Sequence, residues 1–186
     1  MIEKGLILEN KEILLRPLEE SDLKDFLKLT VEPDMWRLYT HDLSSLAGLQ
    51  SWASPAFNGE RVQFTVIDKK TGLIIGSTAF GNISERDKRL EIGWTWLGKE
   101  FQGVGINGKV KGLLLTYCFE VLDLERVEFK TDVLNTQARR SMSNIHAIEE
   151  GVLRSHTVMT NGRRRDTIYF SILKNEWPYV KRENGW

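Results

Sequence analysis

The residues from Glu91 to Asn107 combine an apolar strand pattern, a glycine-rich turn and the start of an amphipathic helix. A helix start carries backbone N–H groups without intrahelical partners and the positive end of the helix dipole, so it binds phosphate without a charged side chain. Gly103 and Gly105 lack a Cβ, which permits a tight turn and a close approach to a ligand. The spacing therefore predicts a pyrophosphate site whose backbone donors come from Gln102, Gly103, Val104, Gly105, Ile106 and Asn107.

Other glycine patterns describe this turn less well. The dinucleotide-binding pattern Gly-x-Gly-x-x-Gly fits in part, but the turn falls in the middle of the expected sheet rather than after the first strand. The P-loop pattern fails because no Gly-Lys-Ser or Gly-Lys-Thr follows. A structural turn that uses glycine only for its backbone angles has the same spacing, so this alternative stays open here.

The elements around the turn follow from hydrophobic periodicity. Residues 89–97 alternate as a strand, 106–121 have helical spacing, and 126–133 form the next strand pattern. A strand, a helix and a strand in succession imply a right-handed crossover between parallel neighbours. One face of the first strand is expected to carry Leu90, Ile92, Trp94 and Trp96, and the other Glu91, Gly93, Thr95 and Leu97.

The remaining patterns complete an α/β chain with the order β-α-α-β-β-β-α-β-α-β-β. We expect one mixed sheet with helices on both faces, in a single domain over residues 1–186. The other expected segments are a hairpin or strand over 7–18, helices over 21–29, 43–57 and 137–145, and strands over 61–67, 73–80, 152–159 and 167–173.

Composition limits the classes of partner. The 26 basic residues equal the 26 acidic ones, so no global charge favours nucleic acid or a membrane surface. One cysteine and the absence of a signal-peptide pattern lead us to expect a cytoplasmic protein. The three histidines have no metal-ligand spacing, so we predict no metal site.

The motifs together resemble the GNAT superfamily of N-acetyltransferases. The turn from Gln102 to Asn107 resembles that family's pyrophosphate turn, with Asn107 in place of a small residue. The segments Leu-Arg-Pro-Leu at 15–18, Glu-Ile-Gly-Trp at 91–94 and Asn-Gly-Arg-Arg-Arg-Asp-Thr at 161–167 resemble its RimL-like branch. That branch includes enzymes that acetylate the N-termini of ribosomal proteins. The resemblance implies a seven-stranded, mostly antiparallel sheet that splays between its fourth and fifth strands, and acetyl transfer from acetyl-CoA to an amine.

The resemblance also assigns residues to the donor. Leu97 matches the position that bonds the pantetheine arm, and Thr95 the position whose N–H faces the acetyl carbonyl. Asn135 matches the residue that reaches the arm across the splay. Arg139 and Arg140 are placed to meet the cofactor's phosphate, with a solvated helix face as the alternative.

Glu91 is the best candidate for the base that deprotonates the acceptor amine. On a regular strand it shares a face with Thr95 at a separation of ~13 Å, so proton transfer needs waters or a bent strand. A free α-amine, with a pKa of about 8, needs only a modest base. The alternative is a paired structural carboxylate.

At the positions where the family carries the acid that protonates the departing thiolate, this sequence has residues that cannot donate a proton. Met142 stands where many GNAT enzymes carry a tyrosine, and Ala138 where the RimL-like branch often carries a serine. Either solvent protonates the thiolate, or catalysis is slow or lost. A module that binds acyl-CoA without turnover is therefore a second class of function.

The sequence does not determine which amine accepts the acetyl group. Branch resemblance favours a protein N-terminal amine, such as that of a ribosomal protein, and the runner-up is a small amine such as a polyamine or an amino sugar. Trp36 and Trp52 lie in the region that the family uses for its acceptor, where they either line a pocket or pack in the core. The two final strands also permit a dimer.

Overall fold

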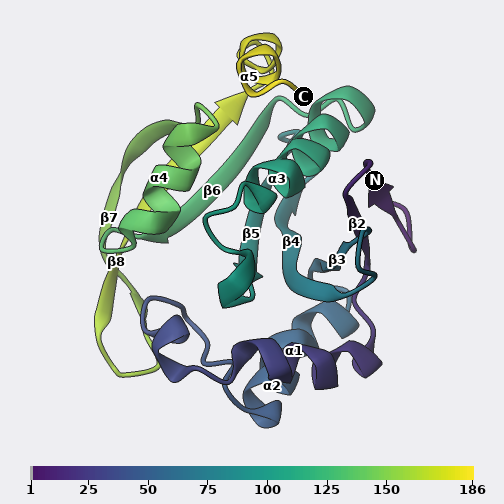
Figure 1. The fold of residues 1–186 in the computed structure, drawn as a ribbon. Coiled ribbons are helices and arrows are strands. Elements are labelled where there is room, and N and C mark those ends of the chain that lie inside the picture. The colour runs from purple at the N-terminus through teal and green to yellow at the C-terminus, as the bar shows by residue number, and fades with distance from the viewer. Residues whose placement is uncertain (1) are drawn as a thin grey trace.

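Alternating apolar residues build one eight-stranded sheet in the computed structural model, which describes residues 2–186 (Figure 1). The strands lie in the order β1-β2-β3-β4-β5-β6-β8-β7, and every neighbouring pair except β5 and β6 is antiparallel. This confirms the mixed, mostly antiparallel sheet. The strands are β1 (Leu8–Glu9), β2 (Ile13–Pro17), β3 (Val62–Asp68), β4 (Ile74–Ser84), β5 (Arg89–Leu97), β6 (Arg126–Asp132), β7 (Ile148–Val158) and β8 (Arg164–Leu173).

The expected count of seven strands is wrong by one, because the opening segment forms a complete hairpin. The side chain of Asn10 accepts hydrogen bonds from the N–H groups of Glu12 and Ile13, at 2.9 and 2.8 Å. An asparagine side chain that bonds its own backbone two or three residues on closes a turn. The turn folds β1 back onto β2, so one expected strand becomes two.

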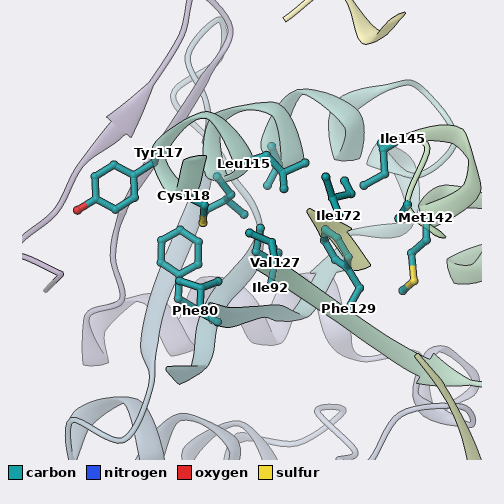
Figure 2. Close-up of a cluster of buried hydrophobic side chains, with 14 of the residues drawn as sticks. Phe80, Ile92, Leu115, Tyr117, Cys118, Val127, Phe129, Met142, Ile145 and Ile172 are labelled. Carbon is teal, nitrogen blue, oxygen red and sulfur yellow. The ribbon is translucent and has the colours of Figure 1, made fainter. Parts of the chain in front are cut away.

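Two hydrophobic clusters lie on opposite faces of the sheet. One joins the sheet to α3 (Ile106–Thr116), α4 (Thr136–Asn144) and α5 (Trp177–Asn184). Figure 2 shows part of it, including Phe80, Ile92 and Phe129. The other joins the sheet to α1 (Leu23–Thr30) and α2 (Leu46–Phe57) through Trp96. The expected helices on both faces are therefore confirmed.

The sequence patterns did not predict α5. Pro178 occupies its first turn, where the missing N–H costs no hydrogen bond. Trp177 stacks on Phe119 with ring centroids 5.3 Å apart, and Trp186 packs against Gly112 of α3. Aromatic burial, rather than an apolar stripe, holds this short helix against α3.

Arg16 and Asp22 form the main polar contact between the sheet and the α1 region. The guanidinium of Arg16 donates to both carboxylate oxygens of Asp22, at 2.8 and 2.6 Å. Asp22, which is 3% exposed, also accepts from Thr65 of β3 and from the N–H of Glu19. Desolvation raises the pKa of this carboxyl, but the bonds from Arg16 and Thr65 outweigh it and leave the pKa below its usual value.

The sheet ends at β1 on one side and at β7 on the other, and most residues of β7 are exposed. Association of two copies through the final strands remains a prediction. Among the residues that the structure describes, no helix is both long and apolar enough to cross a membrane.

We predict that Asp22→Ala lowers the free energy of unfolding by about 3 kcal/mol at pH 7, because it removes the carboxylate that pairs with Arg16 and accepts from Thr65 in a mostly buried site. Asp25→Ala is the matched control, since the Asp25–Lys28 pair is exposed and should contribute within about 1 kcal/mol. Urea denaturation measures both. A depressed carboxyl pKa stabilises the fold above its unfolded value near 4 and loses this effect as pH falls through the folded value. Equal losses for the two variants would contradict the prediction.

Candidate active site

The turn before α3 has the geometry that an anion site requires. Gly103 and Gly105 adopt φ of 75° and 86°, a region that side chains disfavour, and Gly105 caps α3. The N–H groups of Gly103, Val104 and Gly105 donate no hydrogen bond to any residue in 2–186, and these residues are exposed. The first N–H groups of α3 lie beside them without intrahelical partners. These donors form an open cradle for phosphate.

Gln102 fixes the cradle to its surroundings. Its Nε2 donates to the carbonyl of Leu97 at 2.9 Å, and its Oε1 accepts from Gln137 of α4 at 3.2 Å. The side chain therefore positions the turn against β5 and α4 rather than facing a ligand. A carbonyl oxygen has two lone pairs, so Leu97 keeps one for a ligand.

β5 and β6 separate as the resemblance implied. Their parallel pairing covers three positions and ends with Glu91 opposite Glu128. Both strands continue beyond that pair, to Leu97 and Asp132. The space between them opens toward the cradle, and two strand edges face it. An extended chain with amide groups can pair with such an edge.

A bulge in β5 overturns the expected face pattern. Trp94 has φ of 51°, and Trp94 and Thr95 together oppose Thr78 of β4. One extra residue reverses the alternation that follows it. The hydroxyl of Thr95 meets that of Thr78 at 2.8 Å, whereas Trp96 packs on the α1 and α2 side, away from Ile92. Glu91 and Thr95 therefore point to opposite faces, and the predicted shared face is wrong.

The ring of Trp94 occupies space that Gly81 of β4 leaves open. A Cβ on Gly81 would overlap that ring. The guanidinium carbon of Arg61 lies 4.9 Å from the ring centroid of Trp94 and 5.3 Å from that of Trp52. The ring of Trp94 therefore packs against both Gly81 of β4 and the guanidinium of Arg61.

Tyr39 supports the bulge and was missed by the sequence patterns. Its hydroxyl donates to the carbonyl of Thr95 at 3.3 Å. Burial raises the pKa of Tyr39 to about 12, so the hydroxyl keeps its proton at neutral pH. It lies in the irregular segment between the short 3₁₀ turn at Pro33–Trp36 and α2, and no motif marks it.

Glu91 is 3% exposed, and one of its carboxylate oxygens has two partners. Its Oε2 accepts from Asn82 at 2.6 Å and lies 2.7 Å from the ammonium of Lys130. A Cβ on Gly93 would come within 2.8 Å of Oε1, so this glycine leaves room for the carboxylate. The structure shows a paired carboxylate, and its role as a base remains a prediction.

Cations surround Glu91 on this face of the sheet. Lys130 lies 5.9 Å from the ring centroid of Trp94, which Arg61 also contacts. Arg165 is buried near Glu91 and Asp132, and Arg163 pairs with Asp132. Arg163 and Arg165 therefore belong to this cluster, whereas Arg164 between them is exposed and bonds Ser155. Arg61, Lys130, Arg163 and Arg165 outnumber the two carboxylates, Glu91 and Asp132, which are both already paired.

The residues in and next to α4 that were predicted to contact the cofactor differ in how far their side chains are already engaged. Asn135 caps the helix, with its Oδ1 accepting from the N–H of Ala138 at 3.0 Å, so Nδ2 faces outward from the cap. Arg139 donates to the carbonyl of Val133 and lies 3.7 Å from Glu149. Arg140 is exposed. Of the two arginines, Arg140 is the freer to meet a phosphate.

Trp36 and Trp52 lie in the core beneath α1 and α2. Each is 2% exposed, and both make edge-on contacts with Trp96. These observations favour packing over direct contact with an acceptor. Trp94, which is partly exposed, is the aromatic residue at the surface of the site.

Lys111 and Ser141 are a polar pair that the sequence patterns also missed. Ser141 of α4 accepts from Asn107 at 2.9 Å and from the ammonium of Lys111 at 3.0 Å. Asn107 Oδ1 is buried and has no partner in the described chain. Burial lowers the pKa of Lys111 to about 8. On α3, Asn107 Oδ1 thus lacks a partner, and the ammonium of Lys111 has Ser141 as its hydrogen-bond acceptor.

Residues 2–186 contain no group of three or more histidine, cysteine, aspartate or glutamate side chains that could hold a metal ion.

Comparisons with known proteins agree with this geometry. Residues 12–147 match the family model described as Acetyltransferase (GNAT) domain. The putative ribosomal N-acetyltransferase YdaF of Bacillus subtilis strain 168 is 29% identical over 175 residues, which cover 90% of this chain and 94% of that protein. A putative acetyltransferase structure from T. thermophilus has a TM-score of 0.90 at 30% identity, over 100% of this chain and 98% of that one. A spermidine N-acetyltransferase from Vibrio cholerae, solved with CoA and spermine, has a TM-score of 0.75 at 23% identity, over 91% and 99% of the two chains.

We predict that Lys111→Met raises the melting temperature at pH 7, because it removes a buried cation that has no carboxylate partner. A lysine with a lowered folded pKa costs stability below that value, and the cost disappears as pH rises through the unfolded value near 10.4. The gain should therefore shrink between pH 8 and pH 10.5. Thermal unfolding across this range measures it, and a constant or negative difference would contradict the prediction.

Proposed function

Because this chain belongs to the GNAT family and is an N-acetyltransferase, we propose that it transfers an acetyl group from acetyl-CoA directly to a primary amine, with a protein N-terminal amine as the acceptor. The observation that carries the proposal is that the cradle follows β5 in the chain just beyond the part of β5 that has separated from β6. A pyrophosphate suits the cradle, and an arm with amide groups suits the edge. Acetyl-CoA has both parts in that order.

The donor is held mainly by backbone. The N–H groups from Gly103 to Asn107 bind the pyrophosphate, whereas the predicted donor at Gln102 already bonds the carbonyl of Lys99 at 3.3 Å. Leu97 bonds the pantetheine arm. Asn107 Oδ1, buried and unpaired, suits an amide N–H of the arm. The Nδ2 of Asn135 reaches the arm from α4, and Arg140 meets the phosphate end.

Thr95 stabilises the oxyanion that forms when the amine attacks. The bulge removes Trp94 and Thr95 from regular pairing with β4, which turns backbone groups toward the separated edge. Tyr39 holds the carbonyl of Thr95 and so fixes the direction of its peptide groups. One preorganised donor of this kind contributes roughly 3 kcal/mol in the transition state.

Glu91 accepts the proton of the acceptor amine. Lys130 lies 2.7 Å from the carboxylate as its counter-ion, and Asn82 orients it. An α-amine needs a weaker base than a lysine side chain does, which agrees with a carboxylate that already has a counter-ion.

The charges around Glu91 favour a protein N-terminus over a polyamine. A polyamine carries several positive charges and needs unpaired carboxylates. Here Arg61, Lys130, Arg163 and Arg165 would repel it, and both nearby carboxylates are paired. The relative YdaF, which is named as a ribosomal N-acetyltransferase, supports the same class of acceptor.

An acceptor panel tests this proposal. We expect CoA thiol release with a peptide that has a free N-terminal amine, and at most one tenth of that rate with spermidine, an amino sugar, or the same peptide blocked at its N-terminus with a free lysine. Calorimetry with acetyl-CoA should show binding. Binding without release on any acceptor would favour a binding module, and no binding would overturn the proposal.

We predict that Glu91→Gln lowers kcat by about a hundredfold or more while the affinity for acetyl-CoA stays the same, because general-base catalysis typically contributes 10²- to 10⁴-fold. The matched control is Glu128→Gln, which neutralises the carboxylate opposite Glu91 in the β5–β6 ladder. Steady-state rates and calorimetry measure both variants. If the two variants lose kcat equally, Glu91 is not the base.

A further inference from the structure

Lys111 is a buried cation without an anion. It is 5% exposed, and no aspartate or glutamate within residues 2–186 pairs with it. An ammonium group has three donors. One bonds Ser141 at 3.0 Å, and the charge lies 5.4 Å from the ring centroid of Phe129. A buried charge is costly unless an anion or a full set of hydrogen bonds compensates it. Ser141 is the one acceptor that this ammonium has among residues 2–186, so two of its three donors are left for a ligand.

The position of Lys111 identifies the part of the donor that supplies this ligand. Phe129 is the first residue of β6 beyond the last β5–β6 pair, so the ammonium lies near the closed end of the separation. The cradle lies at the open end, and Lys111 is six residues further along α3 than Gly105, about 9 Å along the axis. An arm that starts at the cradle and passes Leu97 toward Thr95 brings its far end, the sulfur, toward the ammonium.

We propose that the ammonium group of Lys111 is the counter-ion and proton donor for the CoA thiolate, and that Ser141 and Asn107 position it. This inference rests on the proposed function. It assigns an acid to a site in which neither Met142 nor Ala138 can act as one. Met142 is buried in the core cluster that also contains Phe129 and Ile145 (Figure 2).

The proton balance of the step is complete. The acceptor nitrogen forms a bond to the acetyl carbon, and the carbon–sulfur bond breaks with its electron pair on sulfur. A proton moves from Nζ of Lys111 to the sulfur and leaves a neutral amine. The proton that the acceptor nitrogen loses goes to Glu91 and then to water, and Lys111 regains one from water. No other reactant is required.

The acidity of Lys111 suits this transfer. Its lowered pKa, about 8, is close to the ordinary thiol value of about 8.5, so the proton moves with little free-energy cost. Burial is the cause of the shift. Charged groups of the elements around it are directed elsewhere: Lys109 pairs with Glu12, Arg139 lies near Glu149, Arg140 is exposed, and Glu91, Glu128, Lys130 and Asp132 lie on the opposite face of the sheet.

Calorimetry with CoA and desulfo-CoA tests the contact with sulfur. In the wild-type chain at pH 8, we expect CoA to bind about tenfold more tightly than desulfo-CoA, since a hydrogen bond to a charged group is involved. In Lys111→Met this preference should vanish while desulfo-CoA affinity is unchanged. Ser143→Ala, an exposed serine of α4, is the matched control and should keep the preference.

Two results would overturn the inference. Equal losses of affinity for CoA and desulfo-CoA would show that Lys111 holds the arm or the phosphate. An unchanged preference in Lys111→Met would show that it does not meet the sulfur. If the wild-type chain binds neither compound, the result overturns the proposed function itself, on which the role of Lys111 rests.

A second variant separates charge from proton donation. Lys111→Arg keeps a positive charge but cannot release a proton in this pH range. We expect it to retain part of the preference for CoA and to turn over as slowly as Lys111→Met. Full turnover in Lys111→Arg would overturn the role of Lys111 as the proton donor.

Discussion

The separation of β5 from β6 is the constraint on which the site depends. Parallel strands normally keep their hydrogen bonds along their whole shared length, and here only three positions pair. The unpaired edges persist because a bulge at Trp94 and Thr95 bends β5, and because Gln102 ties the end of the strand to the turn and to α4. The crossover helix α3 follows β5 after a 3₁₀ turn at Lys99–Phe101 and the glycine turn (Figure 1).

The groups that suit the donor and those that suit the acceptor lie on opposite sides of the sheet. On the side of α3 and α4, Thr95 of the sheet and Asn107 and Lys111 of α3 suit the donor and its leaving group. The opposite face carries Glu91 and its surrounding cations, which suit the acceptor and its proton. The bulge is what connects these two sets, since it reverses the direction of side chains within one strand.

Most of the architecture could be predicted from periodicity, but several site residues could not. The strand, turn and helix from Glu91 to Thr116 follow from alternation and glycine spacing, which are local. The bulge adds a residue without changing the sequence pattern, so the faces of Trp94 and Thr95 were unpredictable. Tyr39 and Lys111 act through contacts with segments distant in the sequence, and no local pattern marks such contacts.

The sizes of the side chains at positions 94 and 81 depend on each other. The ring fills the volume that the glycine leaves on the neighbouring strand, and Arg61 covers its other side. Changing the size of either residue alone produces a void or a collision. A library aimed at new acceptors should therefore vary positions 81 and 94 together, exchanging volume between the two strands while the bulge stays in place.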